Sequence, residues 1–165
     1  MQVAIFQQHA AQPHRGVIGD GKERKTLEVI VKTLDLEHVV NFMGVIPNNE
    51  IPKYLVQGDV FVLPSLSEGF PNVVLEAMAA GLPIVSTNIG GLSEIIHNEE
   101  NGYLVEPKNP EQLANKILKI LKNPEIDHIM SLNNMEKVKE YSWESVTESL
   151  ENIYINILVT LKGKI

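Results

Sequence analysis

The sequence contains no cysteine, which excludes a disulfide framework, a thiol nucleophile and a thiolate metal site. It also lacks an apolar run of the roughly 18 residues that a membrane-spanning helix needs. Its 14 Lys and Arg are outnumbered by 21 Asp and Glu, and the resulting net charge of -7 disfavours nucleic-acid binding through bulk electrostatic attraction. The N-terminus is a poor signal peptide, so we expect a cytoplasmic chain without a transmembrane segment, either free or at the inner membrane surface.

Several sequence motifs that carry common chemistry are missing as well. There is no Asp-x-Asp pair to hold a divalent cation against a diphosphate, no G-x-x-x-x-G-K-[ST] or G-x-G-x-x-G phosphate loop, and no serine in a G-x-S-x-G turn. The five histidines show no metal-ligand spacing. We therefore expect no bound metal and no cofactor, and a ligand would have to be held by other groups.

The overall amino-acid composition is typical of one ordinary folded domain. The chain has 165 residues, of which 44% are hydrophobic and 21% charged, enough to bury a core. Strand-like apolar runs alternate with segments of helical periodicity, and helices alone follow near the C-terminus. This order predicts an α/β fold: a Rossmann-like open parallel sheet flanked by helices, with a helical C-terminus. We predict an irregular N-terminal segment, 1–15, followed by one domain, 16–165.

The individual elements are predicted from apolar spacing and turn residues. The run from Asp59 to Pro64 is apolar at consecutive positions, which is typical of a parallel strand covered on both faces. We predict strands at 16–18, 39–43, 59–64, 83–86 and 102–105, with a further candidate at 3–6. We predict helices at 22–36, 71–80, 110–121 and 143–161, short helices before Gly58 and after Gly91, and one of about 15 residues after Pro124.

The expected helix starts and packing faces follow from particular residues. Asn109 is the expected cap of the helix at 110–121, Ser142 that of the last helix, and Asn48 or Asn49 that of the short helix before Gly58. We expect Trp143 to anchor the last helix in the core.

The loop after Leu63 is the strongest candidate for a binding site, because ligands of open parallel sheets bind beyond the carboxyl ends of the strands. The amides of Asn72, Val73 and Val74 would begin the next helix without intrahelical partners, which favours an anion such as phosphate. Gly69 allows a ligand close to the backbone. Glu68 and Glu76 could accept hydrogen bonds from hydroxyl groups. A ligand with both phosphates and hydroxyls is a nucleotide or a nucleotide-sugar.

Alternatives to this interpretation stay open. Two glutamates eight residues apart could simply be solvated, although the apolar neighbours of Glu76 argue against that. The turn Gly19-Asp20-Gly21 before a basic helix start suits either a phosphate or base contact or a plain glycine turn beside an exposed basic face. The paired Gly90 and Gly91 also suit close ligand approach, but two glycines alone are weak support.

The same residues resemble a known family. Glu68-Gly69-Phe70-Pro71 followed by Glu76 matches the E-x7-E motif of the GT-B retaining glycosyltransferases of family 4, the group 1 glycosyltransferases. The segments that carry the resemblance are 19–21, 42–44, 59–65, 68–85, 90–94, 101–105 and 142–144. The resemblance covers about residues 16 to 158. It implies the C-terminal, donor-binding domain of a two-domain enzyme that binds a nucleotide-sugar, such as a UDP- or GDP-sugar, as its substrate.

The resemblance also implies roles for individual residues. Glu76 would hold the ribose hydroxyls, and Glu68 would lie by the donor sugar as the catalytic residue. Backbone groups of Gly69, Phe70, Asn72 and Val73 would hold the sugar and the diphosphate, with Val45 near the base and Gly19 in the adjoining turn. Transfer is expected with retention at the anomeric carbon and without a bound metal.

The chain also departs from the family pattern. We expect the acceptor-binding domain to be absent from this sequence, and residues 1–15 do not match the segment in which the family keeps an Arg and a Lys for the diphosphate. Arg15, Lys22 and Arg24 are the only nearby cations, and the resemblance places none of them on the donor. We therefore expect weak donor binding and little transfer by this chain alone. The alternatives are a non-catalytic nucleotide-binding or protein-interaction module, and a GT-B sugar epimerase.

The apolar residues of the last helix lead us to expect a partner chain. Ile153, Ile157, Leu158 and Leu161 lie on a helix that, in the family, packs partly on the other domain. Left bare, this apolar surface would recruit a homodimer partner or a separate acceptor-binding chain. The alternative is that these side chains close the core of their own domain.

Overall fold

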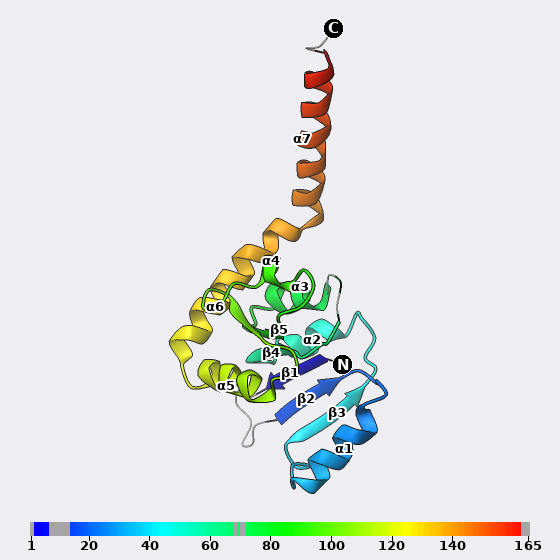
Figure 1. The fold of residues 1–165 in the computed structure, drawn as a ribbon, viewed down its shortest axis with the longest axis vertical. Coiled ribbons are helices and arrows are strands. Elements are labelled where there is room, and N and C mark those ends of the chain that lie inside the picture. Colours follow the sequence, from blue (N-terminus) through cyan, green and yellow to red (C-terminus); the bar gives the residue numbers. More distant parts are fainter. Residues whose placement is uncertain (1, 7–13, 68, 70–71, 163–165) are drawn as a thin grey trace.

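A computed structural model describes residues 2–6, 14–67, 69 and 72–162. Six strands form one sheet in the order β3-β2-β1-β4-β5-β6, with helices packed around it (Figure 1). This architecture confirms the predicted open α/β sheet flanked by helices. The strands are β1 (Gln2–Phe6), β2 (His14–Ile18), β3 (Val40–Gly44), β4 (Val60–Leu63), β5 (Ile84–Thr87) and β6 (Gly102–Val105).

The consecutive apolar residues of β4 are buried on both faces of the sheet, as predicted. Phe61 and Leu63 pack on one face against a cluster that includes residues of helices α2 (Ile51–Leu55), α3 (Asn72–Ala79) and α4 (Leu92–Ile95). Val60 and Val62 pack on the other face against residues of α5 (Pro110–Leu121) and α6 (Pro124–Lys137). Because successive side chains of a strand point to opposite faces, only a strand covered on both sides can bury such a run.

The first strand differs from the prediction. β1 runs antiparallel to both of its neighbours, β2 and β4, whereas β2–β3 and β4–β5–β6 are parallel sets. Only seven residues, 7–13, join β1 to β2, and a parallel crossover needs about a dozen or more. The expectation of an irregular segment at 1–15 is therefore wrong for residues 2–6 and 14–15, while residues 1 and 7–13 lie outside the described part.

The helices follow the predicted order. Asn109 caps α5 as expected, because its side chain accepts a 2.9 Å hydrogen bond from the amide of Gln112. The expected cap of α2 was wrong: Glu50, rather than Asn48 or Asn49, is the residue before the helix, and it makes no side-chain cap bond. The helices are α1 (Arg24–Thr33), α2 (Ile51–Leu55), α3 (Asn72–Ala79), α4 (Leu92–Ile95), α5 (Pro110–Leu121), α6 (Pro124–Lys137), the 3-10 helix η1 (Val138–Tyr141) and α7 (Trp143–Lys162).

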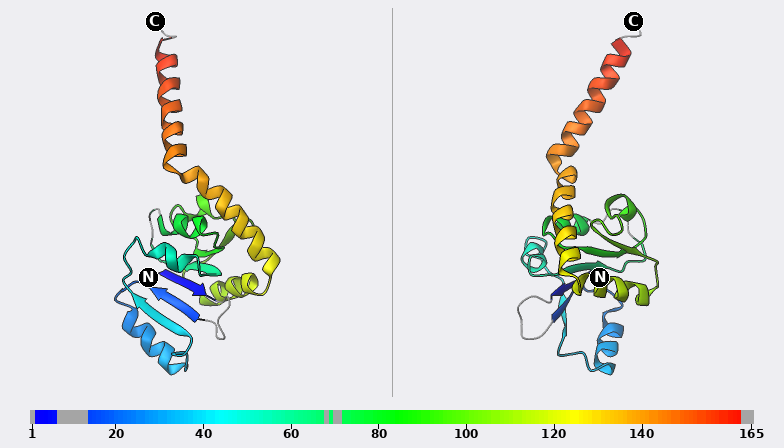
Figure 2. Two further views of the ribbon diagram at one scale, coloured as in Figure 1. Left: turned by 180° about the vertical axis from the view of Figure 1, so that it is seen from behind. Right: turned by 90° about the vertical axis from the view of Figure 1, so that its left-hand side faces the viewer.

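The last helix projects away from the sheet and its covering helices (Figure 2). Its start is as predicted, since the Ser142 hydroxyl accepts a 3.1 Å hydrogen bond from the amide of Ser145. Trp143, expected in the core, is 84% exposed, because α7 leaves the body at that point. Of the part of α7 with described side chains, 143–160, all but Ser145 are exposed, so the helix does not close the core of this domain. No described helix is both apolar and long enough to serve as a membrane span.

Candidate functional site at the carboxyl edge of the sheet

Five strands end at the same edge of the sheet. β2 and β4 are each antiparallel to β1, so they are parallel to one another, and β3, β5 and β6 run in the same direction. The loops after β2, β3, β4, β5 and β6 therefore gather at one rim. Adjacent strands of a sheet lie about 4.8 Å apart, so the loops after β2 and β4 begin roughly 10 Å apart, on either side of β1. The order of the strands also reverses beside β1, which is where open α/β sheets place ligands.

Gly19 and Val45, two of the predicted binding residues, come together at this rim. The amide of Gly19 donates a 2.7 Å hydrogen bond to the carbonyl of Gly44, the residue before Val45. Gly19 and Gly44 have φ of 113° and 68°, conformations that glycine adopts without strain. The side chain of Val45 is 78% exposed. This hydrogen bond therefore holds the two turns together, and the exposed apolar side chain of Val45 next to them is accessible to a ligand.

Arg24 is a residue that sequence reasoning did not place at the rim. Its Nη1 atom lies 3.3 Å from the position that a Cβ on Gly44 would take, and its guanidinium lies 5.9 Å from the centre of the Phe42 ring. Its Nε donates a 2.8 Å hydrogen bond to Glu28, and Asp20 lies 3.8 Å from Nη1. The hydrogen bond to Glu28 raises the pKa of Arg24 further, so this cation stays charged. In the sequence, the signal for this placement was the position of Arg24 at the start of the helix that follows the turn Gly19-Asp20-Gly21.

The loops after β4 and β5 are tied together by side chains of β5. The Ser86 hydroxyl donates a 2.9 Å hydrogen bond to the carbonyl of Leu63, and the Thr87 hydroxyl donates one of 2.5 Å to that of Ser65. Further along, the amide of Gly91 approaches the carbonyl of Gly69 at 3.5 Å. The two glycine-bearing loops that the sequence singled out are therefore neighbours in space. A Cβ added to Gly69 would meet no atom within 4 Å, so its backbone borders open space.

Helix α3 begins at this rim with Asn72, which is exposed, and Val73, which is 9% exposed. The helix buries Val74, Ala77 and Met78 and leaves Glu76 in solvent. No described residue forms an ion pair or hydrogen bond with the Glu76 carboxylate. The predicted residues Glu68 and Phe70, and the expected helix start at Pro71, lie outside the described residues.

A second feature of the same rim is a cavity of about 250 Å³ on the side of β6. Its described lining includes Pro64, Leu66, Thr87, Val105, Lys108 and Leu113. None of the predicted site residues belongs to this described lining, although Pro64 and Leu66 come from the same loop as Gly69. Among the residues that the structure describes, no group of three or more His, Asp or Glu could hold a metal ion.

Comparison with known proteins identifies the family. The sequence model of the family described as glycosyl transferases group 1 matches residues 7–137. The chain belongs to the group 1 glycosyltransferases. An uncharacterized glycosyltransferase of Methanocaldococcus jannaschii is 36% identical over 149 residues, which cover 90% of this chain and 38% of that protein. The chain therefore spans well under half the length of this curated relative.

Solved structures of group 1 glycosyltransferases and related proteins share the fold. The C-terminal domain of the group 1 family protein LpcC from Francisella tularensis matches with a TM-score of 0.68 and 36% identity, over 73% of this chain and 63% of that one. The Anabaena protein Alr3699/HepE, solved in complex with UDP, matches with a TM-score of 0.71 and 27% identity, over 90% of this chain and 40% of that one. These matches confirm the predicted family and the Rossmann-like half of a GT-B fold.

Proposed function

We propose that this chain is the donor-binding domain of a retaining glycosyltransferase and that it binds a nucleotide-sugar at the carboxyl rim of its sheet. The meeting of the loops at Gly69 and Gly91, beside the first turn of α3, is the observation that supports this site most directly. The solved relative with UDP supports a uridine nucleotide, and a guanosine nucleotide is the alternative. The absence of cysteine suits a cytoplasmic location.

Each part of the donor has a matching chemical group at the rim. The free amides at the start of α3 suit a diphosphate, because they and the helix dipole favour negative charge. The unpaired Glu76 carboxylate suits the ribose hydroxyls, and exposed Val45 suits one face of the base. In the proposal Glu68 lies by the donor sugar as the catalytic residue, and the backbone of Gly69, Phe70, Asn72 and Val73 holds the sugar and diphosphate.

Arg24 is the cation that the structure brings to the Gly19–Gly44 turns, but Asp20 and Glu28 already offset its charge. The electrostatic attraction between Arg24 and a diphosphate is therefore weaker than that of an arginine without acidic neighbours. With the net charge of -7, this favours weak binding of the donor. Because the chain spans 38% of its Methanocaldococcus relative, we propose that transfer needs a separate acceptor-binding part.

Calorimetry with UDP, GDP and UDP-glucose tests the site. We expect one nucleotide series to bind, and Glu76→Ala to weaken that binding by about tenfold or more, because a hydrogen bond to a charged group contributes about 1.5–3 kcal/mol. Glu125→Ala is the matched control: Glu125 is an exposed glutamate in the first turn of α6, outside the rim, and its loss should leave the affinity unchanged. Absence of binding by all three ligands, or equal affinity of the Glu76→Ala variant, would refute the donor site.

A substitution at Gly69 probes close approach of the ligand without disturbing the fold. Gly69→Ala adds a methyl group to open space, so the melting temperature should not change. If the sugar or diphosphate lies against this backbone, affinity for UDP-glucose should fall. Unchanged affinity would place the ligand elsewhere on the rim.

A module that binds a nucleotide without transferring a sugar is the second candidate, and the offset charge of Arg24 favours it. An assay of slow donor hydrolysis in the absence of an acceptor distinguishes the two candidates. A transferase domain should release free sugar from the bound UDP-sugar at a rate that falls in a Glu68→Gln variant. A binding module should release none above the rate in buffer.

A further inference from the structure

The hydroxyl group of Thr87 reaches beyond the end of the neighbouring strand. β4 ends at Leu63, which pairs with Ser86 of β5. Thr87 comes one residue later, at the end of β5, and its Oγ1 atom donates a 2.5 Å hydrogen bond to the carbonyl of Ser65. β5 thereby holds the backbone of the loop two positions past the last strand residue of β4.

Thr87 is itself fixed firmly in the fold. It is 4% exposed, and its backbone pairs with Val105 of β6. Its carbonyl accepts a 3.0 Å hydrogen bond from the amide of Ile89. A β-branched side chain also has few χ1 rotamers, so the hydroxyl keeps one position. From that position it can fix the place of the Ser65 carbonyl.

Packing gives the loop little support near Ser65. The cavity of about 250 Å³ at this rim borders Pro64 and Leu66, and the Leu66 side chain is 62% exposed. Side chains that face a cavity or solvent make few van der Waals contacts on that side. The hydrogen bond from Thr87 therefore contributes a larger share of what holds this loop than it would in a close-packed segment.

The same loop carries part of the proposed donor site. Gly69 comes four positions after Ser65, and its carbonyl lies 3.5 Å from the amide of Gly91, which also follows β5. Both Ser65 and Gly69 thus lie beside the segment that begins at Thr87. A shift of Ser65 would move Gly69, whose backbone is proposed to hold the sugar and diphosphate.

We propose that Thr87 is a positioning residue of the donor site. Its hydroxyl holds the Ser65 carbonyl, and through it the backbone at Gly69, in the place that binds the sugar and diphosphate. Thr87 acts through the loop and does not need to touch the ligand. This inference rests on the donor site proposed above. The alternative is a purely structural role, in which the hydroxyl only satisfies a buried acceptor and stabilises the fold.

Two substitutions separate the hydroxyl from the rest of the Thr87 side chain. Thr87→Val removes the hydroxyl and keeps the branched shape, whereas Thr87→Ser keeps the hydroxyl. Thr87→Val should weaken binding of the best ligand among UDP, GDP and UDP-glucose about two- to tenfold, the factor that one neutral hydrogen bond contributes to an equilibrium. Thr87→Ser should bind like the wild type. Equal losses in both variants would implicate the methyl group and overturn the proposal.

Ser86→Ala is the matched control for lost stability. The Ser86 hydroxyl is also buried, and it donates a 2.9 Å hydrogen bond to the carbonyl of Leu63, which the pairing of β4 with β5 already holds. Ser86→Ala and Thr87→Val should lower the melting temperature alike, but only Thr87→Val should weaken binding. The same loss of affinity in Ser86→Ala would show a general effect of stability and overturn the positioning role.

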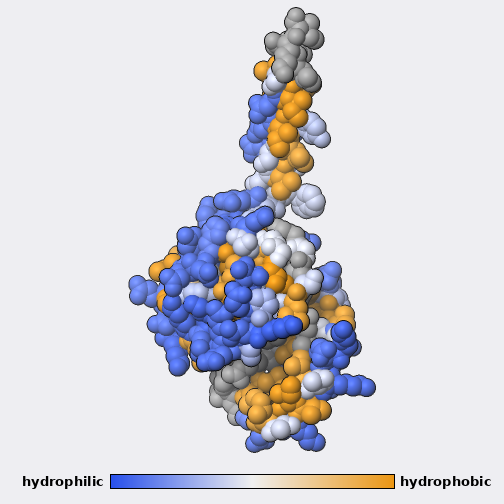
Figure 3. Space-filling view, in the orientation of Figure 1, coloured by the Kyte–Doolittle hydropathy of each residue, from blue (hydrophilic) through white to orange (hydrophobic). Residues whose placement is uncertain are grey.

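Cleavage by chymotrypsin tests the hydrogen bond without a ligand. Proteolysis follows the population of the loop that has left its place, so cleavage after Leu66 should become about two- to tenfold faster in Thr87→Val. In Thr87→Ser the rate should not change. Exposed apolar residues also form a band along α7 (Figure 3), and cleavage there, after Trp143 or Tyr154, is an internal reference that no Thr87 variant should alter.

The donor site and the role of Thr87 can fail separately. A wild-type chain that binds none of the three ligands refutes the donor site, while the cleavage rates still show whether Thr87 holds the loop. Faster cleavage of Thr87→Val with unchanged affinity overturns the positioning role and leaves the donor site standing. Unchanged cleavage after Leu66 in Thr87→Val overturns the hold of Thr87 on the loop.

Discussion

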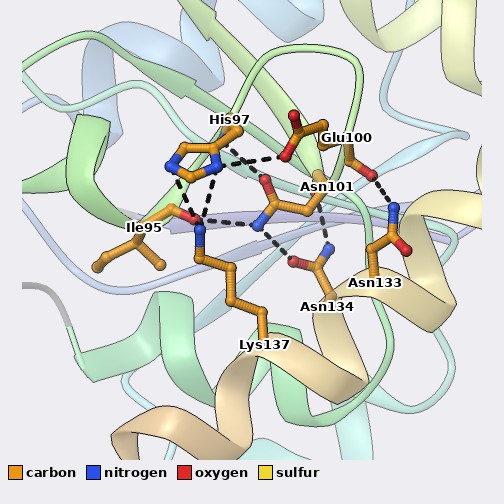
Figure 4. A network of polar contacts seen from close by, with 7 residues as sticks. All are labelled: Ile95, His97, Glu100, Asn101, Asn133, Asn134 and Lys137. Carbon is orange, nitrogen blue, oxygen red and sulfur yellow. Dashed lines mark hydrogen bonds and ion pairs between the residues drawn. The ribbon is translucent and has the colours of Figure 1, made fainter.

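The side chains of Asn101 and Asn134 are hydrogen-bonded to each other inside the protein, with 3.0 Å between Nδ2 of Asn101 and Oδ1 of Asn134 (Figure 4). Asn134 also donates 2.8 Å bonds to the carbonyls of Leu82 and Asn101. The Asn101 carboxamide donates to Ile95 and accepts from the amide of His97. Both asparagines are almost fully buried, so this pair joins α6 to the turns before β5 and β6 with every side-chain polar atom bonded.

Asn134→Ala should lower the free energy of unfolding by about 3 kcal/mol, because it leaves two carbonyl groups and one N–H of the Asn101 side chain without a buried partner. Urea unfolding monitored by circular dichroism measures the change. Asn133→Ala is the neighbouring control: its side chain donates to the Glu100 carbonyl but is exposed, so water can replace it and the loss should be much smaller. Equal losses in the two variants would contradict the role of the buried pair.

Gly102→Ala should be strongly destabilising. A Cβ at Gly102 would lie 2.3 Å from the carbonyl oxygen of Ile84, in the pairing of β5 with β6, so the strands would have to separate. We expect a loss of at least about 2 kcal/mol in thermal or urea unfolding. Gly21→Ala, where the added Cβ meets no atom within 4 Å, should unfold like the wild type. Similar melting temperatures for both variants would count against this close approach.

Glu99 and Lys119 form a 2.9 Å ion pair on the surface, and the hydrogen bond from Lys119 lowers the pKa of Glu99. A lowered pKa in the folded state means that the ion pair stabilises the fold above the ordinary pKa of a glutamate. This stability is lost as the pH falls through the lowered pKa. Glu99→Gln should therefore melt slightly below the wild type at neutral pH and equally at strongly acid pH. The neutral-pH difference should also shrink in high salt.

Trp143 is the only tryptophan and is 84% exposed, so its fluorescence reports what covers the start of α7. We therefore expect the red emission of a solvated indole, and the emission should not change as the concentration rises. A shift to shorter wavelength would contradict this exposure and show that another segment or chain covers the start of α7.

Local sequence signals predicted much of the fold and of the candidate site. The buried run in β4, the Asn109 cap and the Ser142 cap follow from short-range chemistry, and the structure confirms them. The family resemblance was confirmed by the match over residues 7–137. The gathering of the loops with Gly19, Gly69 and Gly90 at one rim followed from strands of a common direction.

Features that depend on distant parts of the chain could not be predicted in the same way. The direction of β1 depends on its two neighbours in the sheet, and the exposure of Trp143 on where α7 leaves the body. Asn134 looks like any polar residue of α6 until the fold brings Asn101 beside it. Arg24 meets Gly44 only because β2 and β3 are paired. The specific roles of Glu68, Glu76 and the other proposed ligand contacts remain predictions.

Among the described strands, β1 lies between the β2–β3 ribbon and the strands β4, β5 and β6, and it is hydrogen-bonded to both β2 and β4. Loss of that strand would leave two separate sheet fragments, each with a newly bare edge. Amide protons of β2 and β3 should therefore exchange through a partial opening that leaves those of β4 and β5 protected. The protein would then consist of two cooperative folding units of unequal stability, joined along the N-terminal residues 2–6.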